Sequence, residues 1–360
     1  MRSERPLAAA ALAVLLLMGT AKPALTVRPI KIPAPEFPPG LAWINSVAFN
    51  LERLRGNRVV MVTFINTMTA ASVRTFPHLN RLWDRYNQKG LMIIGVHTPD
   101  YDFDRDPLSI KDVIERNKIR FPVVIDGSRQ IWKSYRNEGW PAHYLIDHKG
   151  RIIHDRLGEG GFAEFEDEIL QALRKLRRYR PAKNYVIPPD PVRKGCGKAT
   201  AGFYLGSRRG SELKKIRADR SRALVDVRDG EIAAAGRWST ELDAVRSKED
   251  AETPTDDLRL RLIYHGTECL TVLTRTSREP ARVYLKQNNL WLHSGNGGKD
   301  VVWDDDDRSY ILVDKPRLYN ITRNKKEELF ELSFYPARAG VGFASFEFSD
   351  QCQTEAAKPR

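Results

Sequence analysis

The chain has 360 residues, of which 41% are hydrophobic, and a formal net charge of +13. This length is sufficient for two ordinary domains. The basic residues are scattered, acidic clusters such as residues 304–307 interrupt them, and no nucleic-acid-binding motif is present. We therefore expect no nucleic-acid partner. A basic surface also suits anionic glycans and membrane surfaces, so peripheral membrane contact stays open.

The first residues carry a targeting pattern. Residues 7–18 form a short apolar run behind Arg2 and Arg5, and small residues follow at 19–21. This run is typical of a secretory signal peptide, which we assign to residues 1–24, and it is short for a transmembrane helix. An uncleaved N-terminal anchor is the alternative. The pattern predicts a bacterial protein that is periplasmic or secreted.

Residues 59–77 predict a strand, a short loop and the start of a helix. The apolar run 59–64 is followed by turn-prone residues 66–67 and then by apolar residues at helical spacing, with Pro77 inside the helix. We expect a bend at Pro77, because proline removes a backbone N–H donor. The four residues at the junction are Thr69, Ala70, Ala71 and Ser72.

A set of spaced motifs surrounds this junction, and their order resembles the periplasmic TlpA/ResA thioredoxins and, most closely, the thioredoxin-like domain of DipZ-like proteins. The resemblance covers residues 40–178 and implies an α/β thioredoxin-like fold over residues 41–180. The motifs that carry it are residues 43–46, 51–56, 74–77, 90–99, 139–147, 149–152 and 158–161.

The chain departs from this family at the redox positions. Proteins of the family carry Cys-x-x-Cys at this junction, where a helix N-terminus stabilises a thiolate, but here Thr69 and Ser72 occupy the two cysteine positions. The strand acid and the flanking Trp are replaced by Thr63 and Ile65. We therefore expect a redox-silent site with no catalytic residue, in which Thr69 and Ser72 cap the helix.

An enzyme is the alternative to a redox-silent protein. A thiol-disulfide oxidoreductase, or a thiol peroxidase of the redoxin (AhpC/TSA) type, would have to use a non-standard site. Such a site requires one of the three cysteines to reach the Thr69 loop, and these cysteines all lie in the second half of the chain.

Trp140 and Pro141 precede a predicted strand. The family resemblance implies that Pro141 is a cis-proline facing the junction, which leaves the neighbouring backbone free to pair with a bound chain. We expect a groove of Thr69, Ala70, Trp140 and Pro141 that binds an extended peptide or protein partner. The alternative is a turn that serves only the fold.

Two features suggest metal binding but do not require it. Four aspartates occur between residues 100 and 106, but the segment lacks the turn glycine and closing glutamate of an EF-hand loop. We predict a solvated loop there. The seven histidines are too far apart in sequence to form a metal motif, so we expect neither metal nor cofactor.

Proline-rich segments divide the chain: we expect an extended leader at residues 25–40, a linker at 181–198, a β domain at 199–352 and a tail at 353–360. The β domain is predicted to be an antiparallel sandwich, because short apolar runs alternate with turn residues. These runs are residues 258–264, 270–274, 281–285, 310–313, 329–334 and 342–348.

The β domain resembles the C-terminal module of DipZ-like proteins at residues 203–206, 236–238, 283–285 and 316–319. That module is similar to carbohydrate-binding jelly rolls, which implies a jelly-roll-like sandwich and a glycan surface. Trp291 and Trp303 are candidates for stacking on a sugar ring, and packing in the core or an interface is the favoured alternative.

Three cysteines occur, at positions 196, 269 and 352. Cys196 precedes the first predicted strand of the β domain and Cys352 follows the last, and strands at the two ends of a sandwich are often neighbours. We therefore predict a disulfide between Cys196 and Cys352. Cys269 lies in an apolar strand and is expected to be a small buried residue. Together these features predict a binding or scaffold protein.

Overall fold

The computed structural model describes residues 32–177, 179–180, 185–188, 199–210, 214–215 and 227–349. These residues belong to one compact unit. The predicted signal peptide and the predicted Cys196–Cys352 disulfide lie outside the described residues. Among the helices of the described ranges, none has the length and apolar content needed to cross a membrane.

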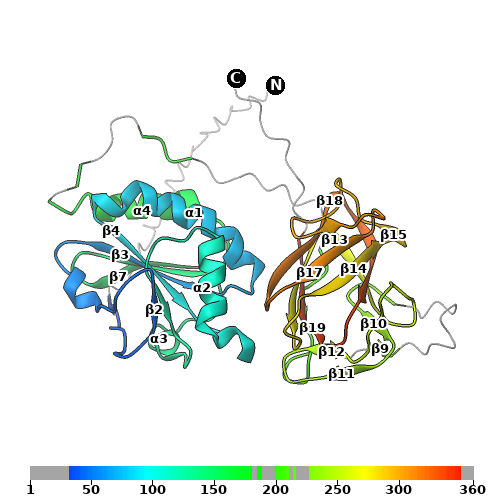
Figure 1. The fold of residues 1–360 in the computed structure, drawn as a ribbon. Coiled ribbons are helices and arrows are strands. Elements are labelled where there is room, and N and C mark those ends of the chain that lie inside the picture. The colour runs from blue at the N-terminus through cyan, green and yellow to red at the C-terminus, as the bar shows by residue number, and fades with distance from the viewer. Residues whose placement is uncertain are drawn as a thin grey trace, which may run out of the picture. The chain divides into compact units, whose positions relative to one another are not determined.

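The first domain is built on a seven-stranded mixed sheet (Figure 1). Strand β3 is central: it runs parallel to β4 and antiparallel to β6, and β4 runs parallel to β5. The strand order is β1-β7-β6-β3-β4-β5-β2. The strands are β1 (Ile32–Pro33), β2 (Trp43–Ile44), β3 (Val59–Ile65), β4 (Leu91–His97), β5 (Val123–Ile125), β6 (Ala142–Ile146) and β7 (Arg151–Leu157).

Alternate residues of β3 enter two hydrophobic cores on opposite faces of the sheet, as expected for a fully buried strand. Met61 and Ile65 pack with the helices α1, α2 and α4, whereas Val62 and Phe64 pack with α3. The helices are α1 (Ala70–Tyr86), α2 (Pro107–Arg116), α3 (Gln130–Ser134) and α4 (Phe162–Leu173), with 3-10 turns η1 (Leu51–Leu54), η2 (Asn87–Lys89) and η3 (Asp102–Arg105).

The first domain extends beyond the predicted range of residues 41–180. On the N-terminal side, Ile32 and Pro33 of the predicted leader pair with β7, and Phe37 is buried in the core. On the C-terminal side, Tyr185 of the predicted linker donates a hydrogen bond to Glu166 at 2.6 Å. The Arg85 guanidinium lies 3.9 Å from the centre of the Tyr185 ring. Both predicted connecting segments therefore contribute to the packing of this domain.

The second domain is an all-β sandwich, as predicted. Its principal strand path is β11-β12-β19-β13-β18-β14-β17-β16. The strands are β8 (Phe203–Tyr204), β9 (Lys214–Lys215), β10 (Ile232–Ala235), β11 (Trp238–Thr240), β12 (Val245–Ser247), β13 (Arg259–Arg275), β14 (Ala281–Gln287), β15 (Leu290–Trp291), β16 (Val302–Trp303), β17 (Ser309–Val313), β18 (Arg317–Pro336) and β19 (Val341–Ser349).

Strand β13 is one long strand where the sequence predicts two. Its first half pairs with β10 and its second half with β19, while β18 follows it along both halves. The pairing with β18 shifts register between Gly266 and Glu268 and again between Cys269 and Leu270. A side chain at Gly266 would meet the Ser349 carbonyl oxygen at 2.9 Å, so the residue must be small. These irregularities bend a continuous strand without ending it.

Cys269 is a buried, free cysteine, which confirms the prediction. It lies in the hydrophobic core of the second domain with Tyr264 and Ile321. Burial raises the pKa of its thiol well above the usual value, because a thiolate is poorly solvated there.

Candidate functional site

The predicted strand, loop and helix junction is present. Strand β3 ends at Ile65, Thr69 is the N-cap residue, and helix α1 begins at Ala70 with Pro77 inside it. The Trp140–Pro141 peptide bond is cis, as the resemblance implied. Thr69 and Trp140 line one cavity of about 270 Å3, so the structure brings together residues from both predicted segments of the groove.

The predicted capping of helix α1 by Thr69 and Ser72 is wrong. The Thr69 hydroxyl donates to the Asn66 carbonyl oxygen at 3.5 Å and makes no cap hydrogen bond. The buried Ser72 hydroxyl accepts from the Asn66 N–H at 3.2 Å, so it closes the loop before the helix. Both hydroxyls are used by the loop, and the first turn of the helix needs another acceptor.

That acceptor comes from the second domain. The Ala70 N–H donates to a carboxylate oxygen of Glu347, in strand β19, at 3.0 Å. Desolvation raises the pKa of Glu347 to about 6, although the Ala70 hydrogen bond and the charge of Arg74 act in the opposite direction, and Asp100 raises the pKa further. A carboxylate therefore stands at the N-terminal end of helix α1, where the helix dipole favours a negative charge.

Thr63 occupies the strand position at which the family resemblance implies an acid, and it forms an uncharged pair with His143. The Thr63 hydroxyl lies 2.8 Å from Nδ1 of His143, and both side chains are buried. Burial lowers the pKa of His143 to about 3, and the positive charges of His78 and Arg156 lower it further. His143 is therefore neutral at physiological pH and does not serve as a proton carrier there.

The acidic loop at residues 100–106 is solvated only in part, which corrects the prediction: Asp100 and Asp104 are buried, whereas Asp102 and Asp106 are exposed. Asp104 is fully buried and accepts hydrogen bonds from Asn66 Nδ2 at 2.7 Å and from the Thr67 hydroxyl at 3.3 Å. His97 Nε2 lies 3.3 Å from the same carboxylate. Asp104 thus orders the loop that connects β3 to α1.

Two other aspartates of this loop bind arginines of the second domain. Arg209 donates to the carboxylate of Asp100 at 2.6 Å, and Arg208 donates to that of Asp102 at 2.6 Å. The Arg209 guanidinium also lies 3.9 Å from the centre of the Tyr204 ring. The Asp102 N–H donates to Asp243 at 2.8 Å. The sequence signal for this contact is the spacing of the acidic residues, which by itself predicts a solvated loop.

An apolar cluster accompanies these polar contacts. Met68 and Tyr101 of the first domain pack with Ala244, Val272 and Ala344 of the second, and all five are buried. Apolar burial of this kind favours association of the two surfaces. The second domain is therefore in contact with the loop that precedes helix α1.

Trp291 and Trp303 lie outside the core. Trp303 is 38% exposed, and its indole N–H donates to the Leu292 carbonyl oxygen at 2.7 Å. Trp291 is half-buried, with the Lys286 ammonium 4.6 Å from its ring centre. Of the favoured expectation, packing in the core or an interface, the core part is thus wrong for Trp303, and packing in an interface stays a prediction.

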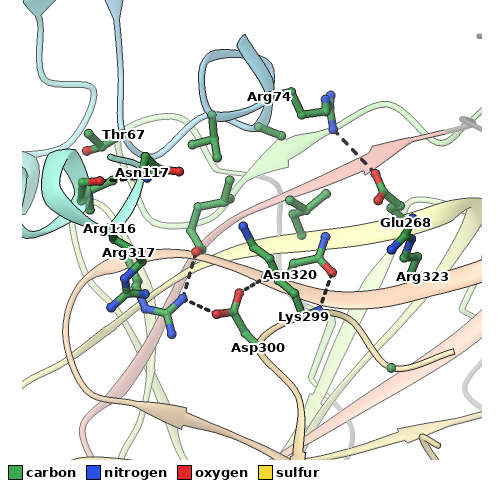
Figure 2. Close-up of a pocket in the computed structure, with 16 residues that line it drawn as sticks. Thr67, Arg74, Arg116, Asn117, Glu268, Lys299, Asp300, Arg317, Asn320 and Arg323 are labelled. Carbon is green, nitrogen blue, oxygen red and sulfur yellow. Dashed lines mark hydrogen bonds and ion pairs between the residues drawn. The ribbon is translucent and has the colours of Figure 1, made fainter. Parts of the chain in front are cut away.

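A larger cavity of about 450 Å3 lies beside the junction (Figure 2). Helices α1 and α2 line one side, and strands β13 and β18 line the other. Figure 2 shows Arg74 directed toward Glu268 and Arg317 toward Asp300. Within the described ranges, no group of three or more His, Cys, Asp or Glu residues is arranged to hold a metal ion.

Comparison with known proteins agrees with this geometry. Residues 33–155 match the model of the AhpC/TSA family. The first domain has a thioredoxin-like fold and is similar to this family over the matched residues. The matched range contains the whole of the β3–α1 junction and the cis-proline, and therefore also Thr69 and Ser72.

The relatives include proteins named as thiol-disulfide oxidoreductases. Protein DipZ of Mycobacterium tuberculosis is 27% identical over 253 residues, which are 68% of this chain and 35% of DipZ. The chain thus spans about a third of the length of that relative. The thiol-disulfide oxidoreductase YkuV of Bacillus subtilis is 27% identical over 144 residues, 40% of this chain and 96% of YkuV.

Among solved structures, a protein described as a putative thiol:disulfide interchange protein DsbE from Chlorobium tepidum is similar to the first domain. It is 23% identical in sequence, with a TM-score of 0.36, and the match covers 40% of this chain and 96% of that protein.

Proposed function

We propose that this chain is a binding or scaffold protein of the TlpA/DipZ type that has lost its redox cysteines and acts outside the cytoplasm. Its relatedness to thiol-disulfide oxidoreductases supports a redox ancestry for the fold. The presence of Thr69 and Ser72 at the cysteine positions supports loss of that chemistry. The apolar run at residues 7–18 supports export, which fractionation of cells expressing the chain would test.

The hydrogen bond from Ala70 to Glu347 carries this proposal. A helix N-terminus activates a thiol by stabilising its thiolate, but here a carboxylate of the same chain accepts the N–H of the first helical residue. Ser72 is buried and its hydroxyl is bonded to Asn66. A hydroxyl also has a pKa far above neutral, so neither Thr69 nor Ser72 replaces a redox sulfur.

The enzyme alternative receives no support from Cys269. This cysteine is fully buried in the core of the second domain, and its raised pKa keeps it a thiol at neutral pH. A reactive cysteine needs thiolate character and access to its substrate. Cys196 and Cys352 lie outside the described residues, so mutagenesis has to test them.

Purified full-length protein should be assayed for insulin reduction in the presence of dithiothreitol and for consumption of hydrogen peroxide. We expect both rates to equal those of buffer alone. A variant with all three cysteines changed to serine is the matched control. Turnover by the natural chain that disappears in this variant would establish the enzyme alternative instead.

We also propose that the partner of the Thr69 and Trp140 face is the second domain of the same chain. Phe203, Tyr204 and Glu347 line the cavity of about 270 Å3 that Thr69 and Trp140 also line. Hydrogen exchange tests this proposal, because amides at the start of α1 should exchange faster when Arg208 and Arg209 are both changed to Ala. Unchanged exchange would favour an external peptide partner for this face.

A glycan-binding role is a second candidate, supported by the exposure of Trp303. An exposed indole provides a flat apolar surface of the kind that stacks on sugar rings. A glycan screen with the natural chain, Trp303→Ala and Trp291→Ala would test it. Binding that is the same in all three proteins would rule out stacking on these residues.

A further inference from the structure

The cavity of about 450 Å3 has apolar residues on both walls. Val73 of helix α1 and Val113 of helix α2 line one wall, and Leu270 of β13 and Leu318 of β18 line the other. This volume is in the range of small-molecule pockets, which are mostly apolar with a few polar groups that fix the ligand. An inorganic anion would leave most of such a space unfilled.

The charged residues around this cavity are mainly cationic. Five arginine and lysine residues line it, against two carboxylates, Glu268 and Asp300. Both carboxylates already have cationic partners, since Arg74 lies 3.8 Å from Glu268 and Arg317 lies 2.8 Å from Asp300. Arg74 also binds Glu159 at 3.1 Å. Arg74 and Arg317 are therefore neutralised by groups of the protein.

The other cations are not neutralised in this way. In the described part of the chain, neither the Lys299 ammonium nor the Arg323 guanidinium has a hydrogen-bond or ion-pair partner, and both side chains are exposed. Arg116 has a carboxylate, that of Asp314, only at 4.0 Å. Figure 2 shows Arg116, Lys299 and Arg323 around the cavity. These cations are available to an acidic group, with which charge-assisted hydrogen bonds are short and strong.

We propose that this cavity binds a small amphipathic organic anion. Its acidic group contacts Lys299 and Arg323, and its apolar body lies against Val73, Val113, Leu270 and Leu318. The combination of unpaired cations with apolar walls selects for a molecule that has both characters. This site involves neither the redox positions nor Trp303, so it goes beyond the proposed function and is tested separately from it.

Three probes distinguish the parts of this proposal. Binding of decanoate, decanol and succinate to the full-length chain would be measured by isothermal titration calorimetry, with decanoate and decanol below their aggregation concentrations. Decanoate has an acidic group and an apolar body, decanol has only the apolar body, and succinate has only acidic groups. We expect decanoate to bind at least tenfold more tightly than either of the others.

The charge of the cavity is tested with a double variant, Lys299→Gln with Arg323→Gln. We expect the Kd for decanoate to rise about tenfold or more, which corresponds to about 1.4 kcal/mol. Both residues are exposed, so the fold should be retained. The matched control is Lys325→Gln with Lys326→Gln, which removes the same charge from exposed residues that do not line the cavity. Its Kd should stay within twofold.

Each contrary outcome overturns the proposal. Absence of decanoate binding would remove the site. Equal binding of decanol would show that the cations play no role, and equal binding of succinate would show that the apolar walls play none. Equal loss of affinity in both double variants would show that decanoate responds to the overall charge of the protein and not to the cations of the cavity. None of these outcomes affects the redox assays.

Discussion

The loop at residues 100–106 and the N-terminus of helix α1 both contact the second domain, but the pKa values of the carboxyl groups at the two contacts shift in opposite directions. A hydrogen bond from Arg208 lowers the pKa of Asp102, so this contact favours the carboxylate. Desolvation raises the pKa of Glu347 to about 6, so burial at helix α1 favours the acid, although the Ala70 N–H favours the carboxylate. The arginine pairs therefore support the contact between the domains at neutral pH, whereas the buried position of Glu347 costs stability as Glu347 ionises.

The difference has a structural cause. At the loop, each of Asp100 and Asp102 has an arginine at 2.6 Å, which compensates for lost solvation at Asp100, and the Asp102 side chain also remains 53% exposed to solvent. At the helix, Glu347 has one backbone N–H, and Arg74 is already engaged by Glu159 and Glu268. A carboxylate in a partly buried contact requires more than one donor to keep its ordinary pKa. Four changes would break or sharpen this comparison.

The largest effect is expected from Arg209→Ala. This change leaves the carboxylate of Asp100 in a nearly buried position without its cation, which should lower the free energy of unfolding by about 3 kcal/mol. Chemical denaturation of the full-length chain would measure it. Arg278→Ala, at an exposed residue, is the control and should change stability by less than about 0.5 kcal/mol. Similar losses in both variants would refute a structural role for the arginine pair.

The second effect is a pH dependence. Because the pKa of Glu347 is higher in the folded state than its ordinary value of 4.5, the folded state binds this proton more tightly. The resulting stabilisation is full below about pH 4.5 and is lost as the pH rises through 6. Relative to Glu347→Gln, the natural chain should lose on the order of 2 kcal/mol between pH 4.5 and 7.5.

Free energies of unfolding at several pH values would measure this difference. Glu252→Gln, at an exposed glutamate, is the matched control, and its difference from the natural chain should not vary with pH in this window. A constant difference for Glu347→Gln would show that the carboxylate is not desolvated at the contact.

The third change introduces two thiols at the junction. The double variant carries Thr69→Cys and Ser72→Cys. In it, the Glu347 carboxylate should raise the pKa of the thiol at position 69, because the carboxylate occupies the Ala70 N–H and repels a thiolate. Adding Glu347→Ala should speed alkylation by iodoacetamide at pH 7 about tenfold, since it lowers that pKa by about one unit. Equal rates with and without Glu347 would mean that the second domain does not control this position.

The smallest effect is expected from Trp303→Ala, which touches neither contact. It removes one hydrogen bond and a partly exposed indole ring, so the free energy of unfolding should fall by about 1 kcal/mol. A loss of more than about 3 kcal/mol is typical of a core aromatic residue and would contradict the exposed position. The same denaturation series provides this measurement.

Much of the fold was predictable because its signals are local. The apolar run and turn residues before Ala70 predicted the β3–α1 junction, and the apolar strand predicted a buried Cys269. The resemblance correctly implied the cis-proline at position 141. By contrast, the sequence divided β13 into two strands, because a periodicity argument does not distinguish a bend from an end.

The candidate site was predictable only in part. The sequence by itself determined that no sulfur stands at positions 69 and 72, since that is a matter of residue identity. Only the tertiary structure decided what occupies the helix end, because the acceptor of the Ala70 N–H is 277 residues away in the chain. The same holds for the burial of Asp104 and the pairing of Asp100 with Arg209. The solvation of a charged group and the presence of a compensating charge depend on which surfaces are in contact in the folded chain. Local patterns of residues do not determine those contacts.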